Sequence, residues 1–196
     1  MQNKDLNIKF KTIVLASMLS IGTLFAGTYN VDVDHSDIGF KVKHMMISNV
    51  KGQFDKYSGV FEYDEKTKTL KSLNGTVDIN SINTKNAKRD EHLKSADFFD
   101  AAKYPSMNLK VTKVDGDVAY TKLSIHGVTK EVKMELELSG RVIKDPWGNT
   151  RTGLSLYGKI NRKDFSLNWN QAIEAGGIVV GDTIKIDIEL EGILVK

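Results

Sequence analysis

The chain has 196 residues, no cysteine and a formal net charge of +3 at pH 7, with 28 lysines and arginines against 25 acidic residues. The lack of cysteine excludes a disulfide framework, thiol chemistry and zinc sites built from thiolates. So small a net charge gives no electrostatic case for binding nucleic acid. The length fits one domain whose core can fold without disulfide or metal support.

The first residues have the pattern of a secretory signal peptide. A lysine-containing start is followed by an apolar run over residues 12–26, and Ala26 before Gly27 supplies small residues for cleavage. The run is shorter than the roughly 20 residues that a membrane-spanning helix needs. We therefore expect a signal peptide at residues 1–26, a mature domain at residues 27–196 that does not span a membrane, and a periplasmic or secreted location.

The first half of the mature chain alternates between apolar and polar residues. This period of two is typical of strands that bury one face of an antiparallel sheet. The predicted strands cover residues 29–33, 38–42, 50–54, 57–63 and 73–79. Residues 64–69 are charged and predict a hairpin loop.

Residues 84–105 form the one stretch with the composition of a helix. Ala, Lys, Arg, Glu and Leu are good helix formers, and Asn86 or Thr84 can cap the first turn. Pro105 ends the segment, and Ser95 offers a second break. We expect one helix, or two short ones, inserted among the strands and lying on the mouth or the wall of a β-structure.

The second half returns to alternation. Predicted strands cover residues 107–111, 123–125, 132–138, 154–160 and 184–190, with turns at 115–117 and 145–148. The sequence therefore predicts an all-β domain of eight or more antiparallel strands, with a short helical insert and no second domain.

A sheet that is apolar on one face must fold into a sandwich or close into a barrel. Glycines within the predicted strands, such as Gly39, Gly59 and Gly75, favour a curved sheet and hence a barrel. The interior of an eight-stranded barrel is either filled by side chains or holds one small ligand. The sequence leaves both alternatives open.

The catalytic signals are weak. The 4 histidines include no pair at a spacing typical of metal ligands, and there is no nucleophile elbow or Gly-rich phosphate loop. We expect no catalytic centre, no metal site and no cofactor. The rival hypothesis is a small hydrolase or metal-dependent enzyme, which would need two of His44, His92 and His126 to meet a carboxylate in one cleft.

Apolar side chains gather at two loops and favour a binding function. Phe98 and Phe99 lie on the insert, and Met45, Met46 and Ile47 follow the second predicted strand. These residues either cover the barrel end as ordinary core or line the mouth of an apolar cavity, where methionine gives an adaptable wall.

Several motifs, in order along the chain, resemble those of the YceI-like family. They are HSDIGFKVKHM at 35–45, VKGQF at 50–54, RDEHLKSADFFD at 89–100 with Tyr104 and Pro105, LSIHGVTK at 123–130 and RKDF at 162–165. The resemblance implies an extended, lipocalin-like antiparallel barrel with a helical insert and a long apolar tunnel. It further implies a polyisoprenoid or similar lipid as ligand and, in many members, a homodimer.

The tunnel would be lined by inward positions of the alternating strands and covered by the insert. The expected lining residues are Ile38, Phe40, Val42, Phe54, Leu109, Ile125, Leu156 and Trp169. Phe98 and Phe99 are the expected lid, and Arg89, His92 or Asn168 could meet a polar head group at the mouth. The alternative is a filled barrel that acts as a structural or stress-response interaction module.

Overall fold

The computed structural model describes residues 26–173 and 176–196. The predicted signal peptide, residues 1–26, lies outside this part of the chain except for Ala26, the first residue of the first strand. In chain order the strands are β1 (Ala26–Val31), β2 (Asp37–His44), β3 (Ser48–Phe54), β4 (Tyr57–Asp64), β5 (Thr69–Asp78), β6 (Ile82–Asn83), β7 (Ser106–Asp115), β8 (Val118–Ile125), β9 (Val128–Leu138), β10 (Ile143–Lys144), β11 (Thr150–Asn161) and β12 (Val180–Leu194).

Helices are few. The described residues contain the α-helix α1 (Ala87–Lys94) and the short 3-10 helices η1 (Val33–His35), η2 (Ile79–Ser81) and η3 (Arg162–Phe165). Among the residues that the structure describes, no helix is both long and apolar enough to cross a bilayer.

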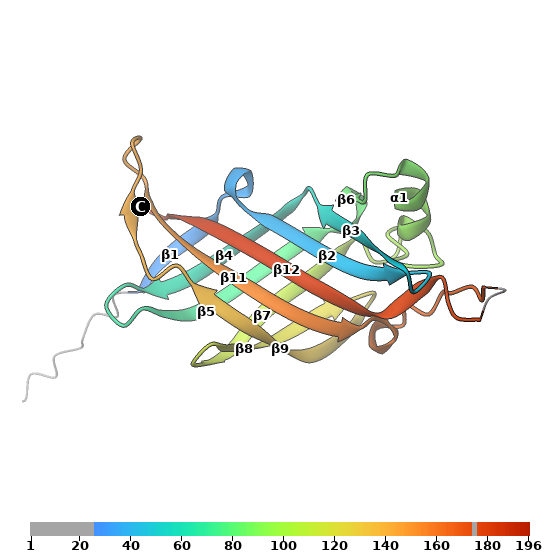
Figure 1. Cartoon of the computed structure of the whole chain (residues 1–196). Helices are drawn as coiled ribbons and strands as arrows, with labels where there is room; N and C mark the ends of the chain where they lie inside the picture. Colours follow the sequence, from blue (N-terminus) through green and yellow to red (C-terminus); the bar gives the residue numbers. More distant parts are fainter. Residues whose placement is uncertain (1–25, 174–175) are drawn as a thin grey trace, which may run out of the picture.

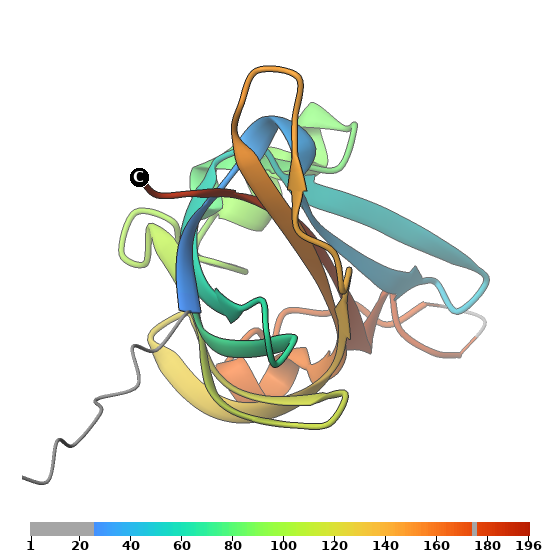
Figure 2. The same ribbon diagram turned by 90° about the vertical axis from the view of Figure 1, so that its left-hand side faces the viewer.

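The strands form one antiparallel sheet that closes on itself. Strand β11 pairs with both β9 and β12, so the series β11-β9-β8-β7-β5-β4-β1-β12 makes a ring of eight strands, as the view along the barrel shows (Figure 2). The predicted all-β fold is confirmed, and the choice between sandwich and barrel is settled in favour of the lipocalin-like barrel.

The long strand β12 joins the two ends of the barrel. Near its C-terminal end Gly192 pairs with Val31 of β1, whereas Ile184 and Ile186 pair with Val42 and Phe40 of β2. Strands β2, β3 and β6 therefore extend the wall beyond the end of β1. Helix α1 lies at this extended end, away from β1 (Figure 1).

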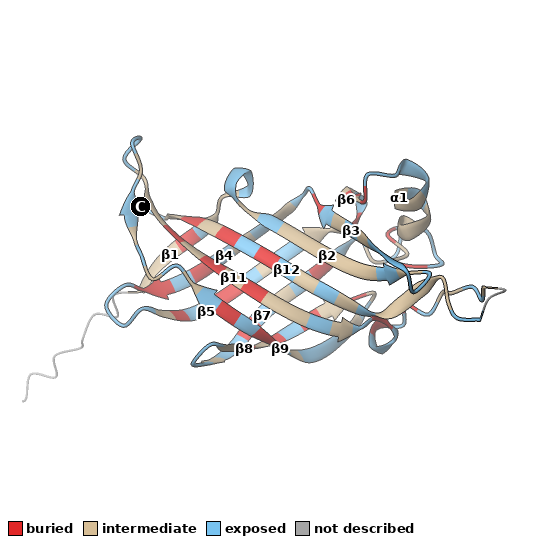
Figure 3. Ribbon diagram, in the orientation of Figure 1, coloured by how far each residue is buried: buried red, intermediate tan, exposed pale blue. Residues whose placement is uncertain are grey.

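Buried and exposed residues alternate along most strands (Figure 3). Aromatic side chains fill the β1 end of the barrel, where the rings of Tyr29 and Phe61 stack with centroids 5.3 Å apart. Gly192 permits this packing, since a Cβ atom there would lie 2.5 Å from the Phe61 ring. Stacked aromatic rings thus close the β1 end, whereas the insert closes the α1 end.

The helical insert is confirmed as one helix followed by a turn. Asn86 caps α1, and its side chain accepts a hydrogen bond from the backbone N–H of Arg89 at 3.1 Å. The helix ends at Ser95, whose backbone N–H bonds to the carbonyls of Glu91 and His92. The chain then passes through turns to β7, so the second short helix that Ser95 could have begun does not form.

Candidate functional site

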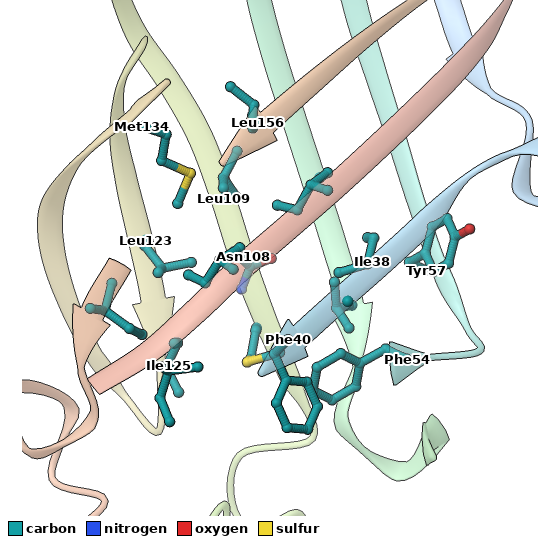
Figure 4. Close-up of a pocket in the computed structure, with 18 of the residues that line it drawn as sticks. Ile38, Phe40, Phe54, Tyr57, Asn108, Leu109, Leu123, Ile125, Met134 and Leu156 are labelled. Carbon is teal, nitrogen blue, oxygen red and sulfur yellow. The ribbon is translucent and has the colours of Figure 1, made fainter. Parts of the chain in front are cut away.

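An apolar channel runs inside the barrel between the packed end and the insert. It has a volume of ≈160 Å³, and its wall includes residues of every strand from β1 to β5, of β7, β8, β9, β11 and β12, and of the insert. Figure 4 shows side chains from several strands pointing into the same space, among them Ile38, Phe40, Leu123, Met134 and Leu156. The interior is therefore neither completely filled nor wide.

The channel is long for its volume. Its wall on β12 extends from Val180 to Leu190, a run of roughly 33 Å at about 3.3 Å per residue. Strands in closed barrels tilt by about 35–45°, so the channel extends about 25 Å along the axis. A compact cavity of about 150 Å³ holds a single benzene ring. Spread over this length, the observed volume has no room for a broad ring system, and one slender chain fits only if the wall moves apart.

The polar residues of the wall have partners or face outward. The Tyr57 hydroxyl donates to the carbonyl of Ser36 at 2.5 Å. Asn108 is exposed, and its side-chain oxygen accepts a hydrogen bond from the Thr76 hydroxyl at 2.9 Å. Ser58 is exposed on the outside of β4. An apolar occupant would therefore meet an apolar surface along nearly the whole described wall.

Arg162 is the one charged residue among the described residues of the wall. Its Nη1 donates to the carbonyls of Leu167 and Trp169, its Nε to the carbonyl of Gly181 at 3.1 Å, and its Nη2 to Asp182 at 3.2 Å. Burial lowers the pKa of the guanidinium, and the Asp182 carboxylate opposes this effect. Arg162 therefore ties the segment after η3 to the start of β12 and fixes that end of the channel.

The insert closes the other side of the same end. Phe98 and Phe99 line the channel together with Leu93 of α1. The Phe99 ring lies edge-on to Phe54 of β3, with centroids 6.3 Å apart. Because Phe98 is almost completely buried, at 7% exposed, the insert is packed onto the barrel and does not stand away from it.

The strand positions predicted from alternation lie together around this channel. Its wall contains the predicted residues Ile38, Phe40, Val42, Phe54, Phe98, Phe99, Leu109, Ile125 and Leu156. Their proposed contact with a ligand stays a prediction.

The remaining predicted residues lie outside the wall. Arg89 donates from Nε and Nη2 to the hydroxyl and carbonyl of Thr84, both at 2.8 Å, and so fastens α1 to the preceding segment. The His92 ring packs edge-on against the Trp169 ring, with centroids 4.8 Å apart. Asn168 is exposed. These residues support the channel end or face solvent, and their contact with a head group also stays a prediction.

Other wall residues were missed by the sequence reasoning. Strand β12 contributes Ile184, Ile186, Ile188 and Leu190, and methionines come from β7 and β9 as Met107 and Met134. The regular alternation of residues 184–190 indicates one apolar face on this strand. The sequence does not reveal that β12 crosses the whole length of the barrel.

Met45, Met46 and Ile47 take neither of the positions expected for them. They form the tip of the β2–β3 hairpin, where they are 40%, 65% and 82% exposed, and they are absent from the channel wall. The expectation failed because the hairpin projects past the barrel end and does not fold over it.

The histidines considered for catalysis lie on separate elements. His44 ends β2, His92 is on α1, and His126 is in the β8–β9 turn against the Tyr104 ring. Among the described residues, the one group of three side chains with metal-ligand spacing is Asp32, His35 and Glu191, with ligand atoms within 4.8 Å of one another.

That group surrounds an arginine. Arg151 Nη1 lies 2.5 Å from Asp32 and 2.6 Å from Glu191, and Arg151 Nε lies 2.7 Å from Asp145. Burial opposes ionisation of Asp145, but hydrogen bonds from Arg151 and Asn149 outweigh it and hold its pKa well below the usual value. The guanidinium lies between the carboxylates, so the cluster is an ion-pair network that joins β11 and β12 to the start of η1 and to the β10–β11 turn.

The fold and the channel define a lipocalin-like antiparallel barrel with an apolar interior. A family model described as a YceI-like domain matches residues 29–192. This match covers most of the chain, and the protein belongs to the YceI-like family.

Individual relatives agree with this assignment. A UPF0312 protein of Staphylococcus aureus is 36% identical over 164 residues, which covers 83% of this chain and 95% of the relative. A Campylobacter jejuni YCEI protein of known structure has 38% sequence identity and a TM-score of 0.67, with 84% of this chain and 96% of that chain covered. A polyisoprenoid binding domain from Saccharophagus degradans shares the fold, with a TM-score of 0.63, 19% identity and coverage of 85% and 98%.

Proposed function

We propose that the protein is a periplasmic or secreted binding protein that holds a long-chain apolar lipid, of polyisoprenoid or fatty-acid type, inside the barrel. The observation that carries the proposal is the channel, which is long, slender and almost entirely apolar. The signal-peptide pattern supports the location. The polyisoprenoid binding domain of the same fold supports the class of ligand.

The length of the channel favours a long chain. The hydrocarbon core of a bilayer is about 30 Å thick, so a lipid tail within one leaflet spans about 15 Å. A channel of about 25 Å is longer than that. It can take an extended tail beyond the ordinary length, or the extended end of a longer chain.

Transfer energies lead to the same class of ligand. Burial of a methylene contributes about 0.8 kcal/mol, whereas association costs about 4–15 kcal/mol before any net affinity remains. A chain of about ten carbons would barely bind, and one of about twenty or more would bind well. With few polar groups in the wall, the protein should select for chain length and only weakly for the head group.

Occupation by such a chain requires the wall to move apart, because the free volume is ≈160 Å³. Met107 and Met134 are suited to this adjustment, since the methionine side chain is unbranched and fills irregular spaces.

The role we propose involves no catalysis, metal or cofactor. The homodimer implied by the family resemblance stays a prediction that light scattering can check.

The test is organic extraction of the purified protein followed by mass spectrometry. We expect a long-chain lipid in amounts close to those of the protein, and uptake of a hydrophobic fluorophore once the lipid has been removed. A lipid-free protein that also fails to take up the fluorophore would contradict the proposal. That result would favour the alternative function, a filled barrel acting as an interaction module, for which the small free volume is the specific observation.

A further inference from the structure

The outer face of the barrel carries a row of lysines that face one another across four neighbouring strands. Lys159 of β11 pairs with Lys185 of β12, Lys185 with Lys41 of β2, and Lys41 with Lys51 of β3. The four strands lie side by side on the face turned to the viewer in Figure 1. Like charges directly opposite each other destabilise a sheet, so the row has a cost that the fold alone does not explain.

No ion pair within the described residues neutralises these lysines. Within residues 26–173 and 176–196, none of the ion pairs includes any of the four lysines. Asp187 is two residues from Lys185 on the same face of β12, and still no ion pair forms.

The row lies in a concave groove of about 1010 Å³. Lys85 and Lys133 also line it, whereas its acidic residues are Asp37, Glu135 and Asp187. Burial and the nearby Asp187 raise the pKa of Asp37, which has no cation beside it. The groove is thus basic in balance, with its positive and negative charges separated along the strands.

The groove also offers groups that bind hydroxyls. Asn49 and Tyr157 contribute a carboxamide and a phenol to its lining, and no arginine is present there. Without a guanidinium, planar two-point recognition of a single phosphate or carboxylate is not available. Neighbouring strands are about 4.8 Å apart, so the row presents point charges over about 14 Å. Such a row matches a chain that repeats its negative charges and carries hydroxyls between them.

From the unpaired lysine row and the groove that contains it, we propose that this outer face binds a linear acidic polysaccharide. Carboxylates along the polymer would contact Lys159, Lys185, Lys41 and Lys51 in turn, and sugar hydroxyls would bond with Asn49 and Tyr157. The site lies on the outside of the barrel wall, so it is separate from the apolar channel and its existence does not depend on lipid binding.

The test measures binding of alginate, a linear polyuronate, to the full chain at low salt, with neutral dextran as the comparison polymer. Wild-type protein should bind alginate and not dextran, and added salt should weaken the binding. Lys185→Glu should weaken it at least tenfold. Lys110→Glu makes the same change of charge on β7, outside the groove, and should leave binding unchanged.

Stability separates a binding role from a structural one. Lys185→Glu replaces two repulsive pairs by attractive ones, so its melting temperature should equal or exceed that of the wild type. Lys51→Glu provides a second variant at the edge of the row, with the same expected loss of alginate binding.

Four results would overturn the proposal. One is the absence of alginate binding by the wild type, and another is an equal effect of Lys185→Glu and Lys110→Glu. The third is binding of polyphosphate or duplex DNA more tightly than alginate, and the fourth is a salt-sensitive dimer that Lys185→Glu dissociates without any polymer. The first two would remove the site, and the last two would assign the groove to another partner.

Discussion

The rings of Phe98 and Trp169 lie with their centroids 5.0 Å apart, and this contact joins the helical insert to the segment after η3. The His92 ring packs edge-on against both, at 5.1 Å from Phe98 and 4.8 Å from Trp169. Phe98 lines the channel, whereas Trp169 lies behind it. The three rings therefore place a residue whose fluorescence can be measured in contact with the wall of the channel end.

Trp169 should report the arrival of a ligand. The protein has 2 tryptophans, and Trp147 is 80% exposed in the β10–β11 turn, so Trp147→Phe leaves Trp169 as the single fluorophore. Addition of a long-chain lipid to the lipid-free variant should change its emission, because Phe98 must adjust to an occupant. Unchanged emission at a lipid concentration that shows uptake by extraction would contradict a ligand at this end of the channel.

Phe99→Ala should weaken lipid uptake more than it weakens the fold. Phe99 is partly buried and lines the channel, so its removal opens the channel end while costing less than the about 3–5 kcal/mol typical of a fully buried phenylalanine. The control is Phe165→Ala, because Phe165 is 1% exposed and outside the channel wall. That variant should lose the full amount of stability while its folded fraction retains uptake. Chemical denaturation measures the loss of stability, and fluorophore uptake measures binding. Equal stability losses with normal uptake in both variants would count against Phe99 as a residue that closes the channel.

Gly75→Leu should block the channel. Gly75 lies in the wall opposite Leu109, and a Cβ atom there would meet only the Ser58 carbonyl oxygen, at 3.7 Å. A leucine side chain can therefore enter the free space without displacing the backbone. We expect a folded protein with little or no lipid uptake. Asn74→Leu, on the outward side of the same strand, is the matched control and should bind normally; comparable uptake by the two variants would argue against an internal site.

The Arg151 network should make the fold sensitive to acid. Burial opposes ionisation of Asp32, but hydrogen bonds from Arg151 and His35 outweigh it, and its pKa lies below the ordinary 3.8, as does that of Asp145. Carboxyls with lowered pKa values contribute stability above the ordinary value, and the contribution is lost as the pH falls through the folded-state values. The melting temperature of the wild type should therefore fall as the pH drops below about 4.

Arg151→Ala tests this assignment. The variant should melt at a lower temperature near neutral pH, because it leaves part-buried carboxylates without their cation. It should also show a smaller further loss in acid. Lys113→Ala removes an ion pair between two exposed residues, Lys113 and Asp115, and should change neither value appreciably. Parallel acid curves for Arg151→Ala and the wild type would mean that other carboxyls cause the acid sensitivity.

Local sequence patterns predict most of the fold. Alternation identified the inward faces of β2, β7 and β11, and Asn86, one of the two caps that the sequence offers, is the N-cap of α1. The closure of the ring could not be read from the chain, because it depends on pairing between β1 and β12, whose partners lie at opposite ends of the sequence, as in Tyr29 with Leu194.

The candidate site was predicted in part, for a related reason. Ile38 and Phe40 follow from strand period alone. Arg89 and His92, which could meet a head group, each have a local partner that the sequence does not predict, Thr84 for Arg89 and Asp97 for His92, and their contact with a head group stays a prediction. Such contacts depend on how turns fold back on a helix, which residue spacing does not specify.

The most direct test of the central claim is a high-resolution electron-density map of the protein purified from its native source. The account predicts continuous, elongated density inside the barrel, running from Phe99 at the insert toward Leu190, with the wall residues moved apart around it. A barrel whose inward side chains meet along the axis, with neither density nor free space between them, would contradict it.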